Sequence, residues 1–336
     1  MKKSLLALAV LGAFAGVASA QSSVTLFGTV DLNAKYVKND GSARRVSLSQ
    51  DGINSSQLGF RGVEDLGGGL KASFILLQGV SADTGTQNGA KLFNRRSTVS
   101  LMGNFGEVRL GRDYTPTFWN NTIFDAFGTV GLGDSTHVGL GLFQSTFVRA
   151  DNSIGYFLPS NIGGVYGQAM VAAAEGVTNG KYIGGRVGFA AGPFDIAGAY
   201  AQSGIIGSTE KAKNFNIGGS YDLGVVKLMG YYDQTKQLTV KQTRVSGSVV
   251  VPMGQGEIHA GFSQGKLDTS PALKAQQLAV GYVYNLSKRT ALYGTVAQIS
   301  NKNGATASIA GGTSQTAAPT AGGKSKGFEV GVRHFF

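Results

Sequence analysis

The stretch Val24-Thr25-Leu26-Phe27-Gly28-Thr29-Val30-Asp31-Leu32-Asn33-Ala34-Lys35-Tyr36 decides the fold. Every second residue counted from Val24 is apolar or glycine, and the residues between them are polar apart from Phe27. Successive side chains of a strand point to opposite faces, so this period of two predicts a strand with one apolar and one polar face. Residues 328–336 at the C-terminus alternate in the same way.

Similar segments recur along the chain with turn residues between them. Short connections such as Gly192-Pro193 and Leu223-Gly224 alternate with long polar or glycine-rich ones such as 38–54 and 302–325. Short turns at one end and long loops at the other are typical of transmembrane barrels. The sixteen predicted strands are 24–37, 55–64, 70–79, 92–103, 106–112, 152–158, 165–177, 182–191, 194–203, 214–222, 225–235, 242–252, 256–265, 274–285, 290–301 and 326–336.

Backbone hydrogen bonding explains why such strands close into a ring. In hydrocarbon every N–H and C=O group needs a partner within the protein, so strands cross a bilayer only as a closed sheet without edges. A ring of about sixteen strands is wide enough to hold water. The sequence therefore predicts an all-β fold, a 16-stranded antiparallel transmembrane β-barrel with a polar inner face and a pore.

Residues 1–20 have the pattern of an export signal: Lys2 and Lys3, an apolar stretch, then the small residues Ala18-Ser19-Ala20. We expect a signal peptide over residues 1–20 and one barrel domain over residues 21–336. Removing Lys2 and Lys3 from the 30 basic residues leaves 28 against 19 acidic ones, a balance of +9. This excess fits an anionic solute or surface, and export argues against nucleic acid.

Composition gives no sign of catalysis or of a cofactor. The chain has no cysteine, which removes disulfides and thiolate metal sites. His137, His259 and His334 lack metal-ligand spacing, and no Gly-x-Ser-x-Gly elbow is present. The sequence also has 52 glycines, 19 Phe and 12 Tyr but only 6 prolines, which favours strands with glycine turns over disorder.

Several motifs together resemble the general porins of the Gram-negative outer membrane, especially the betaproteobacterial branch. They are SVTLFGTVD at 23–31, LGFRGVEDLGGGLKA at 58–72, GEVRLGR at 106–112, Asp151-Asn152-Ser153-Ile154 and the terminal Phe336. The resemblance covers residues 21–336. It implies a homotrimer in the outer membrane, in contact with lipid and lipopolysaccharide, that passes small hydrophilic solutes by diffusion.

The resemblance also implies that the third loop, residues 113–148, folds inward, and that the outer-membrane assembly machinery reads Phe336. Apolar residues of this loop, such as Trp119, Phe124 and Phe127, independently favour packing against the barrel.

The charges at the narrowest part of the pore would set its selectivity. Parity with apolar neighbours turns Arg61, Arg96 and Arg109 inward, although each could also serve as a rim residue or an ordinary salt-bridge partner. At the start of the third loop the resemblance favours Arg112, so we rank Arg112 first and Arg109 second. The predicted constriction residues are Arg61, Arg95, Arg96, Arg109, Arg112 and Arg149, opposed by Asp125 and Asp134.

Two departures from the family pattern affect the expected selectivity. Gln57 stands where related porins often carry a base, and Ile75 and Leu77 stand where they often carry Gln and Glu. The lost carboxylate favours small anions, and the lost base opposes them; we expect net anion selectivity. A channel specific for phosphate or an organic acid, a closed structural barrel and a barrel enzyme are the alternatives.

Overall fold

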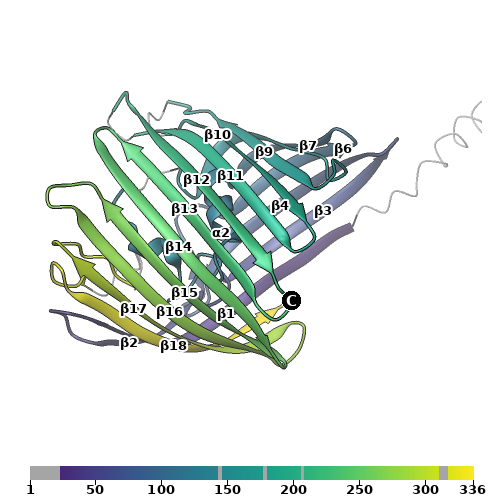
Figure 1. The fold of residues 1–336 in the computed structure, drawn as a ribbon. Helices are drawn as coiled ribbons and strands as arrows, with labels where there is room; N and C mark the ends of the chain where they lie inside the picture. Colours follow the sequence, from purple (N-terminus) through teal and green to yellow (C-terminus); the bar gives the residue numbers. More distant parts are fainter. Residues whose placement is uncertain (1–22, 143–145, 177–179, 206–207, 310–316) are drawn as a thin grey trace, which may run out of the picture.

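The structure, a computed structural model, describes residues 23–142, 146–176, 180–205, 208–309 and 317–336. The signal peptide expected over residues 1–20 lies outside the described residues. The strands form one antiparallel sheet that closes on itself, because β1 (Ser23–Asn39) pairs with β18 (Lys324–Phe335) from Thr29 to Asn39 (Figure 1). The predicted β-barrel is confirmed.

Sixteen of the eighteen strands in this sheet are long and form the ring. Two short ones, β2 (Arg45–Gln50) and β5 (Thr86–Gln87), add to β1 and β4. The other strands of the ring are β3 (Gln57–Gly67), β4 (Leu70–Ser81), β6 (Arg96–Gly103), β7 (Gly106–Tyr114), β8 (Arg149–Phe157), β9 (Val165–Ala172), β10 (Tyr182–Ala191), β11 (Phe194–Gly204), β12 (Lys211–Asp222), β13 (Lys227–Gln237), β14 (Val240–Met253), β15 (Gly256–Leu267), β16 (Leu273–Asn285), β17 (Thr290–Lys302) and β18.

Every predicted segment coincides with one of these strands, and the largest discrepancy is at the end of β9. The alternation predicted a strand to residue 177, whereas β9 ends at Ala172. Glu175 and Gly176 both have positive φ, so the backbone turns there and cannot continue the ladder.

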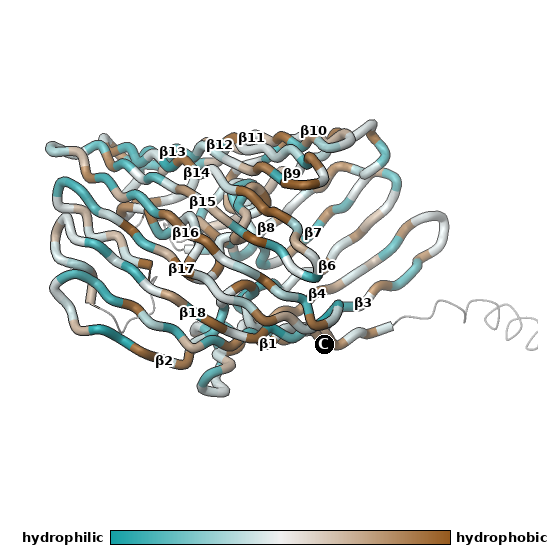
Figure 2. Tube along the Cα trace, turned by 60° about the horizontal axis from the view of Figure 1, so that its bottom comes forward, coloured by the Kyte–Doolittle hydropathy of each residue, from teal (hydrophilic) through white to brown (hydrophobic). Residues whose placement is uncertain are grey.

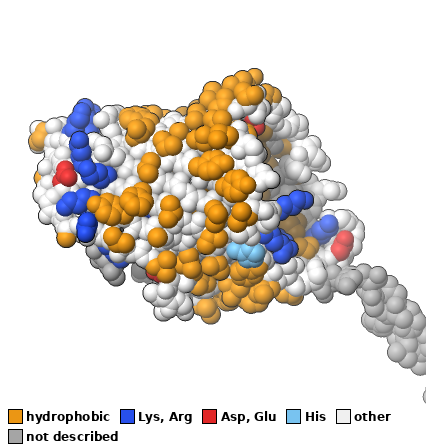
Figure 3. All heavy atoms as spheres, turned by 90° about the horizontal axis from the view of Figure 1, so that it is seen from below, with side chains coloured by type: hydrophobic (Ala, Val, Ile, Leu, Met, Phe, Trp, Pro, Cys, Tyr) orange, Lys and Arg blue, Asp and Glu red, His pale blue; other side chains and the backbone are white. Residues whose placement is uncertain are grey.

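The two faces of the sheet differ as the alternation predicted. On β1, Val24, Leu26 and Val30 are exposed on the outer face, whereas Asp31 and Asn33 are buried on the inner face. Hydrophobic and hydrophilic positions alternate along most strands (Figure 2). On the face shown in Figure 3, hydrophobic side chains cover the middle of the surface, and Lys and Arg side chains gather toward its ends. In the described ranges, no helix has the length and apolar character needed to cross a membrane.

The strand that neighbours β1 is interrupted between β2 and β3, at the level of the inward-facing Asp31 carboxylate. β3 pairs with the first part of β1 and β2 with its last part, and the residues between them leave the ladder. The backbone N–H groups of Gly52, Ile53 and Asn54 donate to the Asp31 carboxylate at 3.1, 2.9 and 2.8 Å. The carboxylate thus replaces the lost strand partners of these groups and holds the segment inside the barrel.

Candidate functional site

The third loop lies inside the barrel and contains α2 (Pro116–Ile123) and the 3-10 helix η1 (Ser135–Val138) (Figure 1). The helix α2 is fixed to the inner wall by amide side chains. Asn120 Nδ2 donates to Asn216 Oδ1 at 2.8 Å and to the carbonyl of Ala197 at 3.1 Å. Asn121 Nδ2 donates to Asp233 Oδ2 at 3.0 Å. These contacts confirm the inward fold of the loop.

The rest of the loop follows the same side of the barrel. The N–H of Ala126 donates to Ser248 Oγ at 3.1 Å, and the N–H of Leu132 donates to Glu329 Oε1 at 3.1 Å. The loop is therefore bound from β11 round to β18. It narrows the barrel from that side, and a cavity lies between Trp119 of the loop and the wall of β6–β9.

The barrel wall against which the third loop packs contains a buried ion pair. The Arg244 guanidinium pairs with Asp233 at 2.9 Å, and their side chains are 1% and 0% exposed. A buried pair of this kind loses its compensation when one partner is removed. Because Asp233 also accepts from Asn121, the pair helps to fix α2 in position.

The opposite wall presents Arg96 and Arg109, as the alternation predicted for their faces. Arg109 is held by two carboxylates, Glu107 at 2.8 Å and Asp113 at 2.6 Å, and its guanidinium lies 3.9 Å from the centre of the Phe157 ring. Arg96 approaches Asp113 at 3.5 Å. Four charges thus form a cluster with little net charge but with arginine donors on the inner wall.

Arg61 lies on the same wall and is exposed to the pore, with its guanidinium over the Phe27 ring at 5.2 Å. Ile75 is directly opposite Arg61 on β4, and Leu77 is directly opposite Arg96 on β6. The two aliphatic residues that depart from the family pattern therefore face inward beside the arginines.

Arg95 and Arg149 lie together near the interrupted strand. Arg95 approaches Asp51 at 3.4 Å, and burial raises the pKa of the Asp51 carboxyl. The Arg149 guanidinium lies 4.1 Å from the centre of the Tyr114 ring, and its Nε donates to the carbonyl of Arg95 at 2.8 Å. The contact between Arg149 and Tyr114 joins the exit of the third loop to its entrance.

Arg112 does not lie on the pore wall. It pairs with Ser97 on β6, on the same outer face as Leu110, and lies at the register shift between Gly111 and Asp113 in the pairing of β7 with β8. Its guanidinium binds Asp151 at 2.6 Å, and its Nε binds the carbonyl of Asn94 at 2.7 Å. The ranking of Arg112 above Arg109 must therefore be corrected, since strand parity gave the better placement.

Asp125 and Asp134 belong to the internal structure of the third loop. Asp125 is buried and accepts from the Phe127 N–H at 2.9 Å and from Ser135 Oγ at 2.6 Å. Burial raises its pKa to about 6. Asp134 caps η1 by accepting from the Thr136 N–H at 2.7 Å. Within the described residues, neither carboxylate forms an ion pair with an arginine.

Comparison with known proteins places this geometry in a family. The family model described as Gram-negative porin matches residues 7–304. The chain belongs to the Gram-negative porins. It is similar to outer membrane porin protein 32 of Delftia acidovorans, with 41% identity over 362 residues and 100% of each chain covered.

Solved structures agree with this assignment. The structure titled anion-selective porin from Comamonas acidovorans has a TM-score of 0.84 and 38% identity, over 94% of this chain and 100% of that one. The trimer form of Vibrio cholerae OmpT shares the fold, with a TM-score of 0.67 and 14% identity, over 94% of this chain and 99% of that one. The predicted family and outer-membrane location are confirmed: the chain is a diffusion channel and not an enzyme.

Sequence reasoning missed further arginines of the porin wall, among them Arg186. Arg186 on β10 is directly opposite Gln168 on β9, and its guanidinium lies 4.7 Å from the centre of the Tyr166 ring. Its neighbour Val187 is exposed on the outer face, so parity alone would have turned Arg186 inward. The signal was present, but no motif drew attention to it.

The three histidines of the porin contact neighbouring backbone and side-chain groups. His259 Nδ1 lies 2.6 Å from the carbonyl of Ala126, and its Nε2 lies 2.9 Å from Glu257, so this histidine joins the third loop to the wall. His334 Nδ1 lies 2.9 Å from Thr290 Oγ1. His137, beside Asp134, is buried, and burial lowers its pKa. In the described part of the chain, no group of three metal-ligating side chains is present.

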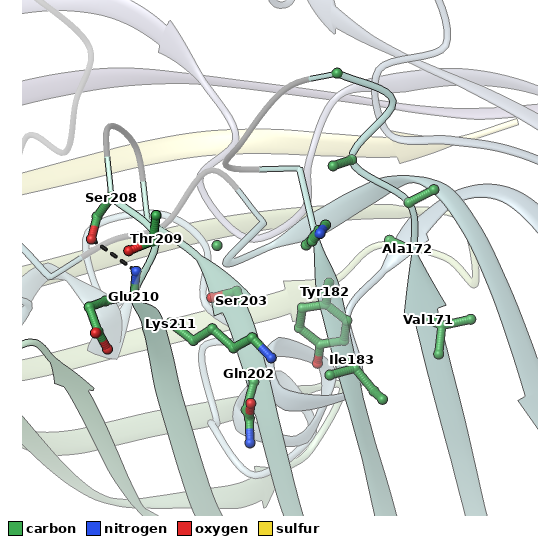
Figure 4. Close-up of a pocket in the computed structure, with 15 residues that line it drawn as sticks. Val171, Ala172, Tyr182, Ile183, Gln202, Ser203, Ser208, Thr209, Glu210 and Lys211 are labelled. Carbon is green, nitrogen blue, oxygen red and sulfur yellow. Dashed lines mark hydrogen bonds between the residues drawn. The ribbon is translucent and has the colours of Figure 1, made fainter.

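A cavity of about 840 Å³ lies away from the arginines, at the loop ends of β9–β12. Figure 4 shows Lys211 and Gln202 beside Val171 and Ile183, which face outward on their strands. Val171 and Ile183 place part of the cavity lining on the outer face of the sheet, and Tyr182 lines it from the inner face.

Proposed function

We propose that this porin is an anion-selective channel for the passive diffusion of small hydrophilic solutes. The observation that carries the proposal is the inner face of β3 and β4. There Arg61 is exposed and has no carboxylate partner among the described residues, and Ile75 stands directly opposite it. A carboxylate at that position would cancel the positive charge. Low-dielectric walls lined by one sign of charge concentrate the opposite ion.

Five of the predicted arginines remain in the proposed constriction, and one is added. Arg96 and Arg109, whose charges are balanced by Glu107 and Asp113, supply hydrogen-bond donors at the narrowest part of the pore. Arg61 supplies a positive charge without a carboxylate partner among the described residues. The opposing wall is the third loop, whose shape depends on Asp125 and Asp134. The proposed set is Arg61, Arg95, Arg96, Arg109, Arg149 and Arg186. The similar porin from Comamonas acidovorans is described as anion-selective, which supports the same sign.

The test is the reversal potential of purified protein in a planar bilayer under a potassium chloride gradient. We expect a potential near the chloride equilibrium value, and a shift toward zero in the Arg61→Gln variant. Lys288→Gln, which removes an exposed charge in the short turn between β16 and β17, is the matched control and is expected to leave the potential unchanged. A reversal potential on the potassium side would overturn the assignment.

The outer rim supports contact with anionic lipid, including lipopolysaccharide. Six lysines share the outward face with apolar residues near the loop ends of β12–β17, and several are direct cross-strand neighbours, as in Lys213 with Lys236 and Lys274 with Lys302. Like charges placed opposite each other destabilise a sheet unless a counter-charge is present. In the described ranges only Asp268 pairs with this lysine belt, which consists of Lys213, Lys236, Lys241, Lys266, Lys274 and Lys302.

Lipid contact can be measured by thermal stabilisation on adding lipopolysaccharide. We expect replacement of Lys236 and Lys274 by Gln to reduce the stabilisation, with Lys288→Gln as the control at the opposite rim. If lipopolysaccharide stabilised the parent protein, the variant lacking Lys236 and Lys274 and the Lys288→Gln control equally, this role for the lysine belt would be contradicted.

The oligomeric state, the export signal and the role of Phe336 are also proposals. The resemblance to general porins supports a homotrimer, which conductance steps in groups of three would test. It also supports cleavage before Gln21, testable by N-terminal sequencing of outer-membrane protein. For Phe336 it supports recognition by the assembly machinery. Removal of Phe336 should then reduce insertion in cells more than spontaneous folding in detergent.

A further inference from the structure

Trp119 is the one exposed aromatic residue of α2. Its neighbours Phe118 and Asn120 are buried against the barrel, whereas the Trp119 side chain is 38% exposed. The helix is thus turned so that its indole faces away from the wall that holds it. An indole left in a water-filled channel forgoes the gain of apolar burial, which a ligand ring would restore.

The indole borders a cavity of about 270 Å³ on the arginine side of the pore. This is near the lower limit of about 300 Å³ for small-molecule sites, a size suited to a ligand with one ring. Tyr114 and Trp119, with ring centroids 5.6 Å apart, line it from the third loop. Phe157 lines it from β8. Aromatic surfaces therefore reach the cavity from both the loop and the barrel.

The two arginines of the cavity differ in how many of their hydrogen-bond donors already have a partner. Arg109 donates to Glu107 at 2.8 and 2.9 Å and to Asp113 at 2.6 Å, so both carboxylates are occupied. Arg96 makes one hydrogen bond, from Nε to Thr98 Oγ1 at 3.2 Å. Within the described residues its two terminal nitrogens have no hydrogen-bond partner. Two parallel donors of this kind match a carboxylate.

We propose that this cavity is a binding subsite for small aromatic carboxylates, with the ring between Trp119 and Phe157 and the carboxylate on Arg96. The inference deepens the proposed anion selectivity and rests on it. Ring contact separates such ligands from acetate or chloride, and the free donors of Arg96 separate them from neutral aromatic compounds. The channel then passes most anions by diffusion and retains this class for longer.

Trp119 provides a direct readout because it is the single tryptophan of the chain. The folded protein in detergent is titrated with benzoate, acetate and benzamide while the indole emission is recorded. We expect a saturable change with benzoate and at least about tenfold weaker binding of acetate and benzamide, which corresponds to about 1.4 kcal/mol. Equal or non-saturable responses to all three probes would overturn the subsite.

Variants locate the binding. We expect Phe157→Leu and Arg96→Gln each to weaken benzoate binding severalfold. The control Phe215→Leu removes an aromatic ring from the lipid-facing side of β12 and should leave the binding unchanged. Heat-modifiable migration shows that each variant is folded. Benzoate should also block chloride current in the parent protein and block it less in Trp119→Leu. Unchanged affinity in both Phe157→Leu and Arg96→Gln would refute the site.

The two proposals fail differently. If the parent protein reverses near the chloride potential but binds benzoate no better than acetate, only the subsite is wrong. If it reverses near the potassium potential, the proposed selectivity is wrong, and the subsite loses its basis with it.

Discussion

At the scale of single residues, Arg109 and Arg112 form a matched pair on one strand. Arg109 faces the pore between Glu107 and Asp113, and Arg112 faces outward and binds Asp151. Arg109→Gln leaves two inner carboxylates without their shared partner, so we expect a shift of the reversal potential toward potassium and a loss of roughly 3 kcal/mol of stability. Arg112→Gln should leave the potential unchanged. Equal shifts in the two variants would contradict the assigned faces.

The same pair shows what sequence can reveal about individual side chains. Alternation alone turned Arg61, Arg96 and Arg109 inward, because each stands an odd number of residues from an apolar outer position (Phe60, Val99 and Leu110). It did not reveal their partners: that Asp113 joins Arg96 to Arg109 depends on the pairing of β6 with β7 and on how the side chains pack. Arg112 was misplaced because the motif was followed where the alternation pointed elsewhere.

At the scale of elements, the third loop depends on close approach to the wall. An ideal Cβ on Gly218 of β12 would lie 2.4 Å from Phe124 Cδ2. We expect Gly218→Val to push Phe124 and its loop toward the pore, lowering single-channel conductance and costing about 1–3 kcal/mol of stability. Gly198→Val on neighbouring β11 is the control, since the nearest atom to its Cβ is 3.9 Å away and its face is outward. Unaltered conductance in Gly218→Val would argue against this dependence.

Asp125 makes the stability of the loop depend on pH. Burial raises its pKa from 3.8 to about 6, so the folded protein keeps this proton over a range in which the unfolded chain has released it. The resulting stabilisation is complete below pH 3.8 and is lost as the pH rises through about 6, a change of about 3 kcal/mol. We expect the melting temperature to fall across this range, and Asp125→Asn to fall less. Parallel pH profiles of the two proteins would exclude Asp125 as the cause.

The elements that sequence did not predict are short ones whose positions depend on contacts with residues distant in sequence. The sixteen long strands could be predicted because each contains many alternating residues, all of which support the same assignment. β2 and the turn after it lie in a segment expected to be a loop, and their course is set by the Asp31 carboxylate, 20 or more residues away in sequence. The helix α2 has eight residues and takes its position from the bonds that Asn120 and Asn121 donate to Asn216 on β12 and Asp233 on β13, so its own pattern carries little information.

At the scale of the whole molecule, closure of the ring brings the last residue against the first strand. The N–H of Phe336 donates to the Gly28 carbonyl and the N–H of Gly28 to the Phe336 carbonyl, both at 3.1 Å. An ideal Cβ on Gly28 would lie 2.3 Å from Phe336 Cζ and 2.6 Å from the Gln57 carbonyl oxygen. The ring can rotate away, but the carbonyl belongs to the neighbouring strand and cannot.

We therefore expect Gly28→Ala to lower the free energy of unfolding by about 1–3 kcal/mol, since the added methyl group overpacks the junction of Gly28 and Phe336 at the end of the ladder that closes the barrel. The measurement is the temperature at which the compact, heat-modifiable form converts to the unfolded one on electrophoresis. Gly294→Ala, on the outer face of β17, is the control, because its Cβ would meet its nearest atom at 3.6 Å. If both variants convert at the same temperature as the parent protein, the junction of Gly28 and Phe336 tolerates a methyl group. The strength of closure must then come from the ladder between β1 and β18 as a whole and not from this junction.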